Sequence, residues 1–288
     1  MTTIEQQRDS LFHGRTAVLA TMHRKEQVIT PLLQQELGIQ VVVPALDTDQ
    51  FGTFTRDVKR SGDQLSAARL KAEAALQLTG SDLALASEGS FGMHPAIPFL
   101  PYSREIVVLI DLVNDLEIVG TALSTETNFS HIQVTQLEEA HTFAQKVDFP
   151  THGLVVMAAP SAAPADIIKD ITTAEALTEA VTEMLSRFGQ AHLETDMRAM
   201  HNPTRMKIIA QATENLVQKI RQCCPQCGCP GLDIVEQQAG LPCAWCGSPT
   251  HLILATRYAC QKCSFQQKVL FPNQQEKADP AQCNYCNP

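Results

Sequence analysis

Residues 223–286 read CCPQCGCPGLDIVEQQAGLPCAWCGSPTHLILATRYACQKCSFQQKVLFPNQQEKADPAQCNYC and contain all ten cysteines of the 288-residue chain. Eight of these cysteines form four Cys-x-x-Cys pairs, which are Cys224/Cys227, Cys243/Cys246, Cys260/Cys263 and Cys283/Cys286. A Cys-x-x-Cys turn directs two thiolates at one metal ion, and two such turns complete a tetrahedral zinc site. The four pairs therefore predict two structural zinc ions.

The spacing does not decide which pairs share an ion. The spacers between successive pairs are 15, 13 and 19 residues long, and sequential, nested and crossed pairings each satisfy the ligand count. Gly228 and Gly247 directly follow two of the pairs, as a tight turn with positive φ requires. Cys223 and Cys229 lie outside the four pairs, and we expect neither to be a ligand.

Two other interpretations of the cysteines stay open. They can ligate an iron–sulfur cluster, or they can pack in a core as reduced thiols, although four equal spacings favour a metal. Disulfides are disfavoured, because the opening residues MTTIEQQRDS carry no export signal and we expect a cytoplasmic protein. Strand-like runs at 233–235, 251–256 and 266–271 offer only a thin core, so zinc would supply folding free energy.

The chain divides where the cysteines begin. Residues 1–221 are predicted to form an α/β domain, and residues 222–288 a small zinc-ribbon-like domain. Twenty-two Lys and Arg against 31 Asp and Glu give a net charge of −9, which disfavours nucleic acid as a partner. No apolar run approaches the roughly 18 to 20 residues of a membrane span, so we expect no membrane association.

The first 221 residues alternate between strand and helix patterns. Strands are predicted at 16–20, 39–43, 82–86 and 153–158, a hairpin at 105–112 and 116–121 around Asn114 and Asp115, and helices at 28–37, 63–80, 134–147, 173–187 and 203–221. This order predicts a mixed sheet between helices, which is a three-layer α/β domain. Four charged residues gather before the last helix, and they are Glu194, Asp196, Arg198 and Arg205. We expect an ion-paired helix entry, and the alternative is that they clamp a substrate phosphate from the other side.

Three loops that follow predicted strands are rich in polar residues, at the position where α/β sheets bind ligands. The first, residues 21–26, opens a helix, where backbone N–H groups and a cation can hold a phosphate. The second loop contains Asp47, Asp49, Thr53, Thr55, Arg56, Arg60 and Asp63. The third, residues 87–95, places Glu88 beside Gly89.

Carboxylates near phosphate-binding cations are what a magnesium-dependent phosphoryl enzyme needs. We expect Glu88 and Asp63 to be catalytic, either by holding magnesium or by orienting the attacking water. Thr21, His23 and Lys25 are expected to bind the phosphate groups. The alternatives are structural, because residues 23–26 can form a solvated helix start and Asp63 can act only as a helix cap.

Three segments resemble the first half of the inosine triphosphate pyrophosphatase superfamily. They are VLATMHRKEQVITPLLQQELGIQVVV (18–43), ARLKAEAAL (68–76) and DLALASEGSFG (82–92). In that superfamily a Thr-x-Asn-x-x-Lys phosphate loop follows the first strand. Here Thr21 matches the Thr, His23 replaces the Asn, and Lys25 stands one position early.

The later motifs of that superfamily match in part. Lys71 and Ala72 match its Lys-Ala step, and Glu88 matches one of two acidic residues that follow a strand. Ser87 replaces the other acidic residue, and Ser66 stands where a metal-binding Glu is expected. The resemblance covers residues 16–125 and implies a pyrophosphatase-like fold and activity.

Taken whole, the chain is also similar to an uncharacterised bacterial family, a domain of unknown function, in which the α/β part precedes a Cys-rich tail. The combined expectation is a magnesium-dependent hydrolase of nucleotides or related phosphorylated metabolites. The alternative is a non-catalytic ligand-sensing or adaptor protein, whose zinc ribbon binds a protein or nucleic-acid partner. Homo-oligomerisation through the zinc tail is a further expectation.

Overall fold

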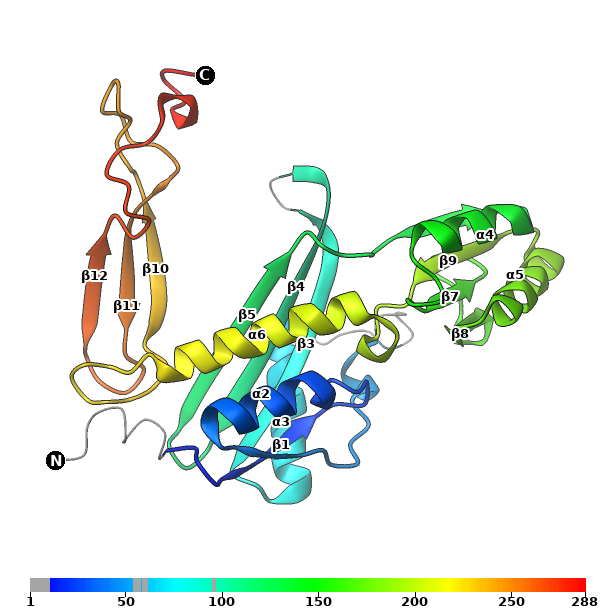
Figure 1. The fold of residues 1–288 in the computed structure, drawn as a ribbon, viewed down its shortest axis with the longest axis horizontal. Coiled ribbons are helices and arrows are strands. Elements are labelled where there is room, and N and C mark those ends of the chain that lie inside the picture. The colour runs from blue at the N-terminus through cyan, green and yellow to red at the C-terminus, as the bar shows by residue number, and fades with distance from the viewer. Residues whose placement is uncertain (1–10, 54–57, 59–61, 95–96) are drawn as a thin grey trace. The chain divides into compact units, whose positions relative to one another are not determined.

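The computed structural model of the chain describes residues 11–53, 58, 62–94 and 97–288. The chain forms two compact units, residues 12–217 and a unit that contains residues 218–288 (Figure 1). Thr55, Arg56 and Arg60, which the sequence placed in a candidate ligand loop, lie outside the described residues.

The larger unit contains a sheet of mixed direction, ordered β2-β1-β3-β4-β5. Its strands are β1 (Thr16–Ala20), β2 (Gln40–Val42), β3 (Leu83–His94), β4 (Ile97–Asp111) and β5 (Leu116–Ser124). β1 pairs in parallel with β2 and β3, whereas β4 pairs antiparallel with β3 and β5. The predicted mixed sheet is confirmed, and so is the β4–β5 hairpin, whose turn holds Asp115 at a φ of 48°.

Helices α2 (Glu26–Leu37) and α3 (Gln64–Thr79) connect the parallel strands. Because the strand order is β2-β1-β3, the two crossovers run in opposite directions, and right-handed connections then place the helices on opposite faces. The alanines of α3 pack on the face of Val18, Ala84 and Ile106. Both helices end where predicted, at glycines in the left-handed region, Gly38 and Gly80.

β3 is longer than the sequence pattern indicated. Residues 87–94 continue the strand, because they pair with β4 from Glu88 opposite Ile106 to His94 opposite Ile97. The prediction of a loop after residue 86 is therefore wrong for residues 87–94. Glu88 and the neighbouring glycines suggested that the strand ends at residue 86. They belong to β3 because pairing with β4 satisfies the backbone hydrogen bonds of this segment.

Helix α6 (Pro203–Arg221) packs on the face opposite α3, and Gly120 in β5 allows this packing. Gly120 pairs with Val107, and side chains of adjacent strand residues alternate between faces, so Val107 faces away from Ile106 and α3. A Cβ on Gly120 would lie 2.2 Å from the carbonyl oxygen of Ala212. The sheet therefore lies between helices, in the predicted three layers (Figure 1).

Gly120→Ala is expected to destabilise the protein by about 3 kcal/mol, because the added Cβ meets helix backbone that cannot rotate aside. Gly92→Ala is the matched control in β3, since a Cβ there would meet nothing within 4 Å, and its effect should stay below about 0.5 kcal/mol. Urea denaturation followed by circular dichroism measures both variants. Equal stabilities of the Gly120→Ala and Gly92→Ala variants would show that α6 does not pack closely against β5.

Residues 131–195 form a second sheet, ordered β6-β9-β7-β8, with antiparallel neighbours. Its strands are β6 (His131–Val134), β7 (Leu154–Met157), β8 (Ile167–Ile171) and β9 (Ala191–Thr195), and its helices are α4 (Leu137–Lys146) and α5 (Ala174–Phe188). The helices and strands share one apolar core around Phe143, Val156 and Val181. Only β7, α4 and α5 were predicted, because β6, β8 and β9 are short and partly polar.

The smaller unit is built on one antiparallel ribbon, ordered β10-β11-β12. Its strands are β10 (Asp233–Ala239), β11 (Ile253–Ala259) and β12 (Gln266–Leu270). β10 and β12 are largely exposed, and three of the buried residues of this unit are cysteines, Cys224, Cys243 and Cys283. Apolar packing alone is too small to fold such a ribbon.

Short 3₁₀ helices occupy Asp49–Phe51, Pro164–Asp166, Ala199–His201 and Pro280–Gln282.

The α6 helix is 19 residues long and contains several charged residues. Within the described ranges, no helix has both the length and the apolar character that crossing a membrane requires.

Candidate functional site

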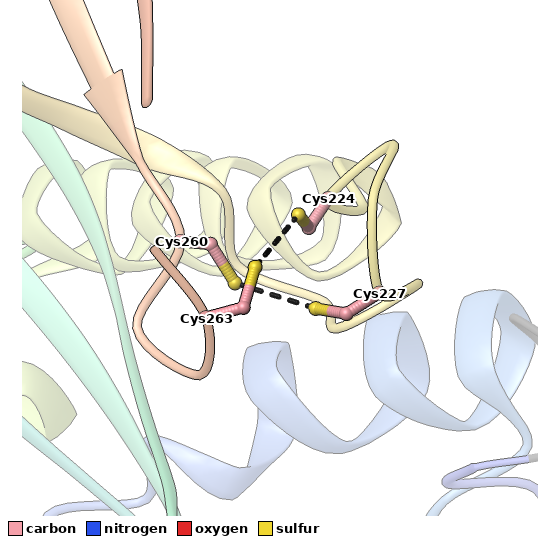
Figure 2. A group of neighbouring side chains, drawn as sticks. All are labelled: Cys224, Cys227, Cys260 and Cys263. Atoms are coloured by element: carbon pink, nitrogen blue, oxygen red, sulfur yellow. Dashed lines mark hydrogen bonds between the residues drawn. The ribbon is translucent and has the colours of Figure 1, made fainter. Parts of the chain in front are cut away.

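Two groups of four cysteines lie in residues 218–288. The first is Cys224, Cys227, Cys260 and Cys263, and the second is Cys243, Cys246, Cys283 and Cys286. Figure 2 shows the first group, in which the loop after α6 faces the loop between β11 and β12. Within each group, all four sulfur atoms lie within 4.8 Å of one another. Each group can therefore hold one zinc ion.

The sulfur separations fit a single tetrahedral ion. The Sγ–Sγ distances are 3.6 Å for Cys227–Cys260, 3.7 Å for Cys224–Cys263 and Cys246–Cys283, and 3.8 Å for Cys243–Cys286. A Zn–S bond of about 2.3 Å gives a tetrahedron edge of about 3.8 Å. A disulfide requires a bond of about 2.05 Å. A cluster of several iron and sulfide atoms does not fit between sulfurs this close, which argues against the iron–sulfur alternative.

The structure selects the crossed pairing, in which the first turn joins the third and the second joins the fourth. The reason is the register of the ribbon, where Asp233 at the start of β10 pairs with Ala259 at the end of β11. This register brings the residues before β10 next to the loop after β11. At the other end of the ribbon, Leu270 pairs with Ala255, so the chain after β12 returns toward the turn between β10 and β11.

Backbone hydrogen bonds hold the cysteine turns. The N–H groups of Gly228, Gly247 and Asn287 donate to the carbonyls of Cys224, Cys243 and Cys283 at 2.8, 3.0 and 2.8 Å. Gly228 and Gly247 have a φ of 74°, as predicted. Hydrogen bonds from Ser248 lower the pKa of Cys246 to about 6, which favours the thiolate that a metal needs. Cys223 and Cys229 belong to neither group.

The larger unit contains a polar pocket with about 520 Å³ of empty space, part of it open to solvent. Its lining residues are Ala20, Thr21, Met22, His23, Lys25, Thr48, Asp49, Gly52, Thr53, Lys71, Glu88, Lys169 and Arg198. The structure thus brings together four of the five residues predicted to be catalytic or phosphate-binding, and they are Thr21, His23, Lys25 and Glu88. Their functional roles stay predictions.

Buried polar contacts fix the pocket wall. The Glu88 carboxylate forms an ion pair with the ammonium of Lys71 from α3, and the side chains are 6% and 9% exposed. Lys25 Nζ donates to the carbonyl oxygen of Ser87 at 2.9 Å. Gln64 Nε2 donates to the carbonyl oxygen of Glu88 at 2.7 Å. These contacts hold the start of α2, helix α3 and strand β3 in one arrangement.

Burial and crowded positive charge set the protonation of two lining residues. Burial, followed by the charge of Arg205, lowers the pKa of Lys25 to about 7. Burial, followed by the charge of Lys25, lowers the pKa of His23 to about 3. His23 is therefore neutral at pH 7, and its contact with Asp49, 3.5 Å from Nε2 to Oδ1, does not join two charges. An anion in the pocket would reduce the repulsion that depresses the Lys25 pKa.

Residues 71–288 match a family described as Domain of unknown function (DUF6671). The chain belongs to the DUF6671 family. The matched region includes both cysteine groups and, of the pocket, Lys71, Glu88, Lys169 and Arg198, whereas residues 21–25 precede it. No curated protein matches the chain.

Two basic residues of this DUF6671 protein reach the pocket from the second sheet. Lys169 belongs to β8, and Arg198 follows β9. The sequence analysis assigned Arg198 to ion pairs, and it does pair with Asp196 at 2.6 Å and Asp170 at 2.9 Å. Lys169 was assigned no role. No local sequence signal marks Lys169, because β8 was not predicted.

The two predicted catalytic carboxylates of the DUF6671 protein, Glu88 and Asp63, do not meet in this pocket. Asp63 does not line it, and its carboxylate instead caps α3 by accepting a hydrogen bond from the Ser66 N–H at 2.7 Å. Glu88 and Asp49 are the lining carboxylates, and Glu88 is already paired with Lys71. In the described part of the chain, three or more metal-ligating groups converge only at the two cysteine sets. Magnesium binding in this pocket stays a prediction, because Mg²⁺ is commonly held by one or two carboxylates together with substrate phosphates.

Proposed function

We propose that the larger unit binds a small phosphorylated compound in this pocket. The observation that carries the proposal is the convergence of Lys25, Lys71, Lys169 and Arg198 on one pocket in a chain whose net charge is −9. Lys71 is paired with Glu88, and Arg198 with Asp196 and Asp170. Positive charge still helps to lower the pKa of Lys25, and an anionic ligand would offset that repulsion.

The lining side chains suggest how phosphate groups would be held. The lysines neutralise negative charge, and the Arg198 guanidinium presents a planar set of donors that matches phosphate oxygens. Thr21 and neutral His23 add uncharged donors. The resemblance of residues 16–125 to the inosine triphosphate pyrophosphatase superfamily supports a nucleotide as the ligand. Hydrolysis is the proposed reaction, with Glu88 orienting the attacking water.

Release of phosphate and pyrophosphate from standard and deaminated nucleoside triphosphates tests this reaction. The intact protein is assayed with and without magnesium, beside Glu88→Gln. Selective release that the variant loses would support hydrolysis with Glu88 as its carboxylate. Full activity of Glu88→Gln would remove that role from Glu88.

A non-catalytic ligand sensor is the second candidate function. It is favoured by the ion pair that already engages Glu88 with Lys71. Calorimetric titration with the same nucleotides distinguishes the candidates. Saturable binding without turnover would favour the sensor, and an absence of binding would contradict both.

Lys25 makes phosphate binding pH-dependent. Its pKa is about 7 in the free protein, and a bound anion raises it, so binding takes up a proton above pH 7. The affinity for inorganic pyrophosphate is therefore expected to fall by up to about tenfold per pH unit above pH 7. Calorimetry at several pH values measures this slope.

Lys25→Arg is the control for that slope, because the guanidinium stays charged throughout this range while the ionisation of pyrophosphate itself is unchanged. The difference between the two slopes isolates the contribution of Lys25. Identical slopes would contradict proton uptake by Lys25.

A further inference from the structure

The second cysteine group carries two exposed aromatic residues, Trp245 and Tyr285. Each side chain is 80% exposed, although burying an aromatic side chain removes about 150–250 Å² from water and is normally favourable. Trp245 is the one tryptophan in the sequence. A unit with so thin a core thus leaves its largest apolar side chain in solvent.

The two aromatic residues occupy the same position in their turns. Trp245 stands directly before Cys246 and Tyr285 directly before Cys286, and both turns belong to one metal group. The corresponding positions of the first group hold Gln226 and Lys262. The aromatic pair is therefore specific to one of the two groups and does not follow from the turn geometry itself.

Backbone contacts hold both aromatic positions. The two turns close with the same hydrogen bond, from Gly247 to Cys243 at 3.0 Å and from Asn287 to Cys283 at 2.8 Å. The Trp245 N–H also donates to the sulfur of Cys243 at 3.4 Å. A metal bound by all four thiolates would hold the two turns together, so the rings would be presented with little loss of entropy on binding.

The charge around this group is negative. Four thiolates around one Zn²⁺ carry a net charge of about −2. Residues 241–252 contain no Asp, Glu, Lys or Arg, and residues 272–288 contain Glu276, Lys277 and Asp279. The faces of aromatic rings also carry negative potential. A phosphate backbone is disfavoured at such a surface, whereas a cation is attracted to it.

We propose that the surface of Trp245 and Tyr285 binds an arginine-containing segment of a partner protein. The guanidinium group stacks flat on aromatic faces and is weakly hydrated, so it is better suited to these rings than the ammonium of lysine. The zinc-thiolate charge adds long-range attraction. This proposal is independent of the ligand of the larger unit.

Titration of the full chain with a Gly-Arg repeat peptide tests the proposal. Because Trp245 is the only tryptophan, its fluorescence reports binding at this surface directly. The Gly-Arg peptide is expected to change the emission saturably, and binding should weaken as salt rises. A Gly-Gln peptide of equal length should bind at least about tenfold more weakly. Equal binding of the two peptides would overturn the proposal.

Two variants and one control locate the binding. Trp245→Ala and Tyr285→Ala should each weaken Gly-Arg binding about tenfold in calorimetry, while metal analysis shows unchanged zinc content. Leu270→Ala, an exposed position on β12, should bind as the unsubstituted protein does. Unchanged affinity in both aromatic variants would overturn the assignment. If a single-stranded oligothymidylate bound more tightly than the Gly-Arg peptide, the surface would be a nucleic-acid-binding surface, and the proposal would be overturned.

Discussion

Replacing Cys224 and Cys243 together by serine is expected to abolish both zinc sites, whereas replacing Cys224 and Cys260 together leaves one site intact. The reason is the crossed pairing, which places Cys224 with Cys260 and puts Cys243 in the other group. Zinc per chain, measured by mass spectrometry of the metal, should be close to zero in the first variant and close to one in the second.

The two double variants distinguish the possible pairings. Under sequential pairing, Cys224 and Cys243 would share an ion, so the first variant would keep one zinc and the second would keep none. That outcome would contradict the register of β10 and β11. Under nested pairing, both variants would lose both ions.

Zinc removal is expected to unfold the smaller unit. Structural zinc sites contribute on the order of 10–16 kcal/mol of apparent binding free energy, which is as large as the total stability of a typical domain. The largely exposed β10 and β12 strands offer little packing to replace it. Chelation should therefore collapse the dispersed NMR signals of the β10-β11-β12 ribbon into the narrow range of an unfolded chain, while signals of residues 12–217 persist.

Arg205→Leu is expected to destabilise the larger unit by about 3–5 kcal/mol, because it leaves the Glu105 carboxylate buried without its cation. The two side chains are 1% and 0% exposed, and Arg205 Nε lies 2.6 Å from Glu105 Oε1. Arg205 also donates to the carbonyl oxygen of Met197. The pair occupies the space over Gly89, where a Cβ would lie 2.4 Å from Glu105 Oε1.

Urea denaturation measures the Arg205 effect against two comparisons. Arg69→Leu breaks the partly exposed pair with Glu117, whose side chains are 42% and 32% exposed, and should change stability by less than about 1 kcal/mol. Combining Arg205→Leu with Glu105→Leu should restore part of the loss, because the second change removes the unpaired carboxylate. A loss of equal size in Arg205→Leu and Arg69→Leu would show that burial does not govern these pairs.

Local signals predicted the strands of the first sheet but only one strand, β7, of the second. The caps at Asp63, Gly38 and Gly80 marked helix ends correctly, because capping depends on residues adjacent in the chain. β8 and β9 have only five residues each, and β9 pairs with β6 and β7, which lie far from it in the chain. The extension of β3 past residue 86 likewise depended on β4.

The residues that line the pocket likewise include some that local sequence patterns identified and others that only the tertiary structure brought there. Thr21, His23, Lys25 and Glu88 were identified because each follows or interrupts an apolar strand pattern. Lys169 and Arg198 reach the same pocket only through the folding of the second sheet. The sequence made Asp63 either a catalytic candidate or a helix cap. In the structure Asp63 caps α3.

For the metal sites, the sequence by itself determined the eight ligands and the number of ions, because two Cys-x-x-Cys turns supply one tetrahedral shell. Which turns share an ion was decided only by the tertiary structure. Antiparallel pairing sends alternate turns to opposite ends of the β10-β11-β12 ribbon. The first and third turns therefore meet at one end and the second and fourth at the other, a result that depends on strand register and not on spacing.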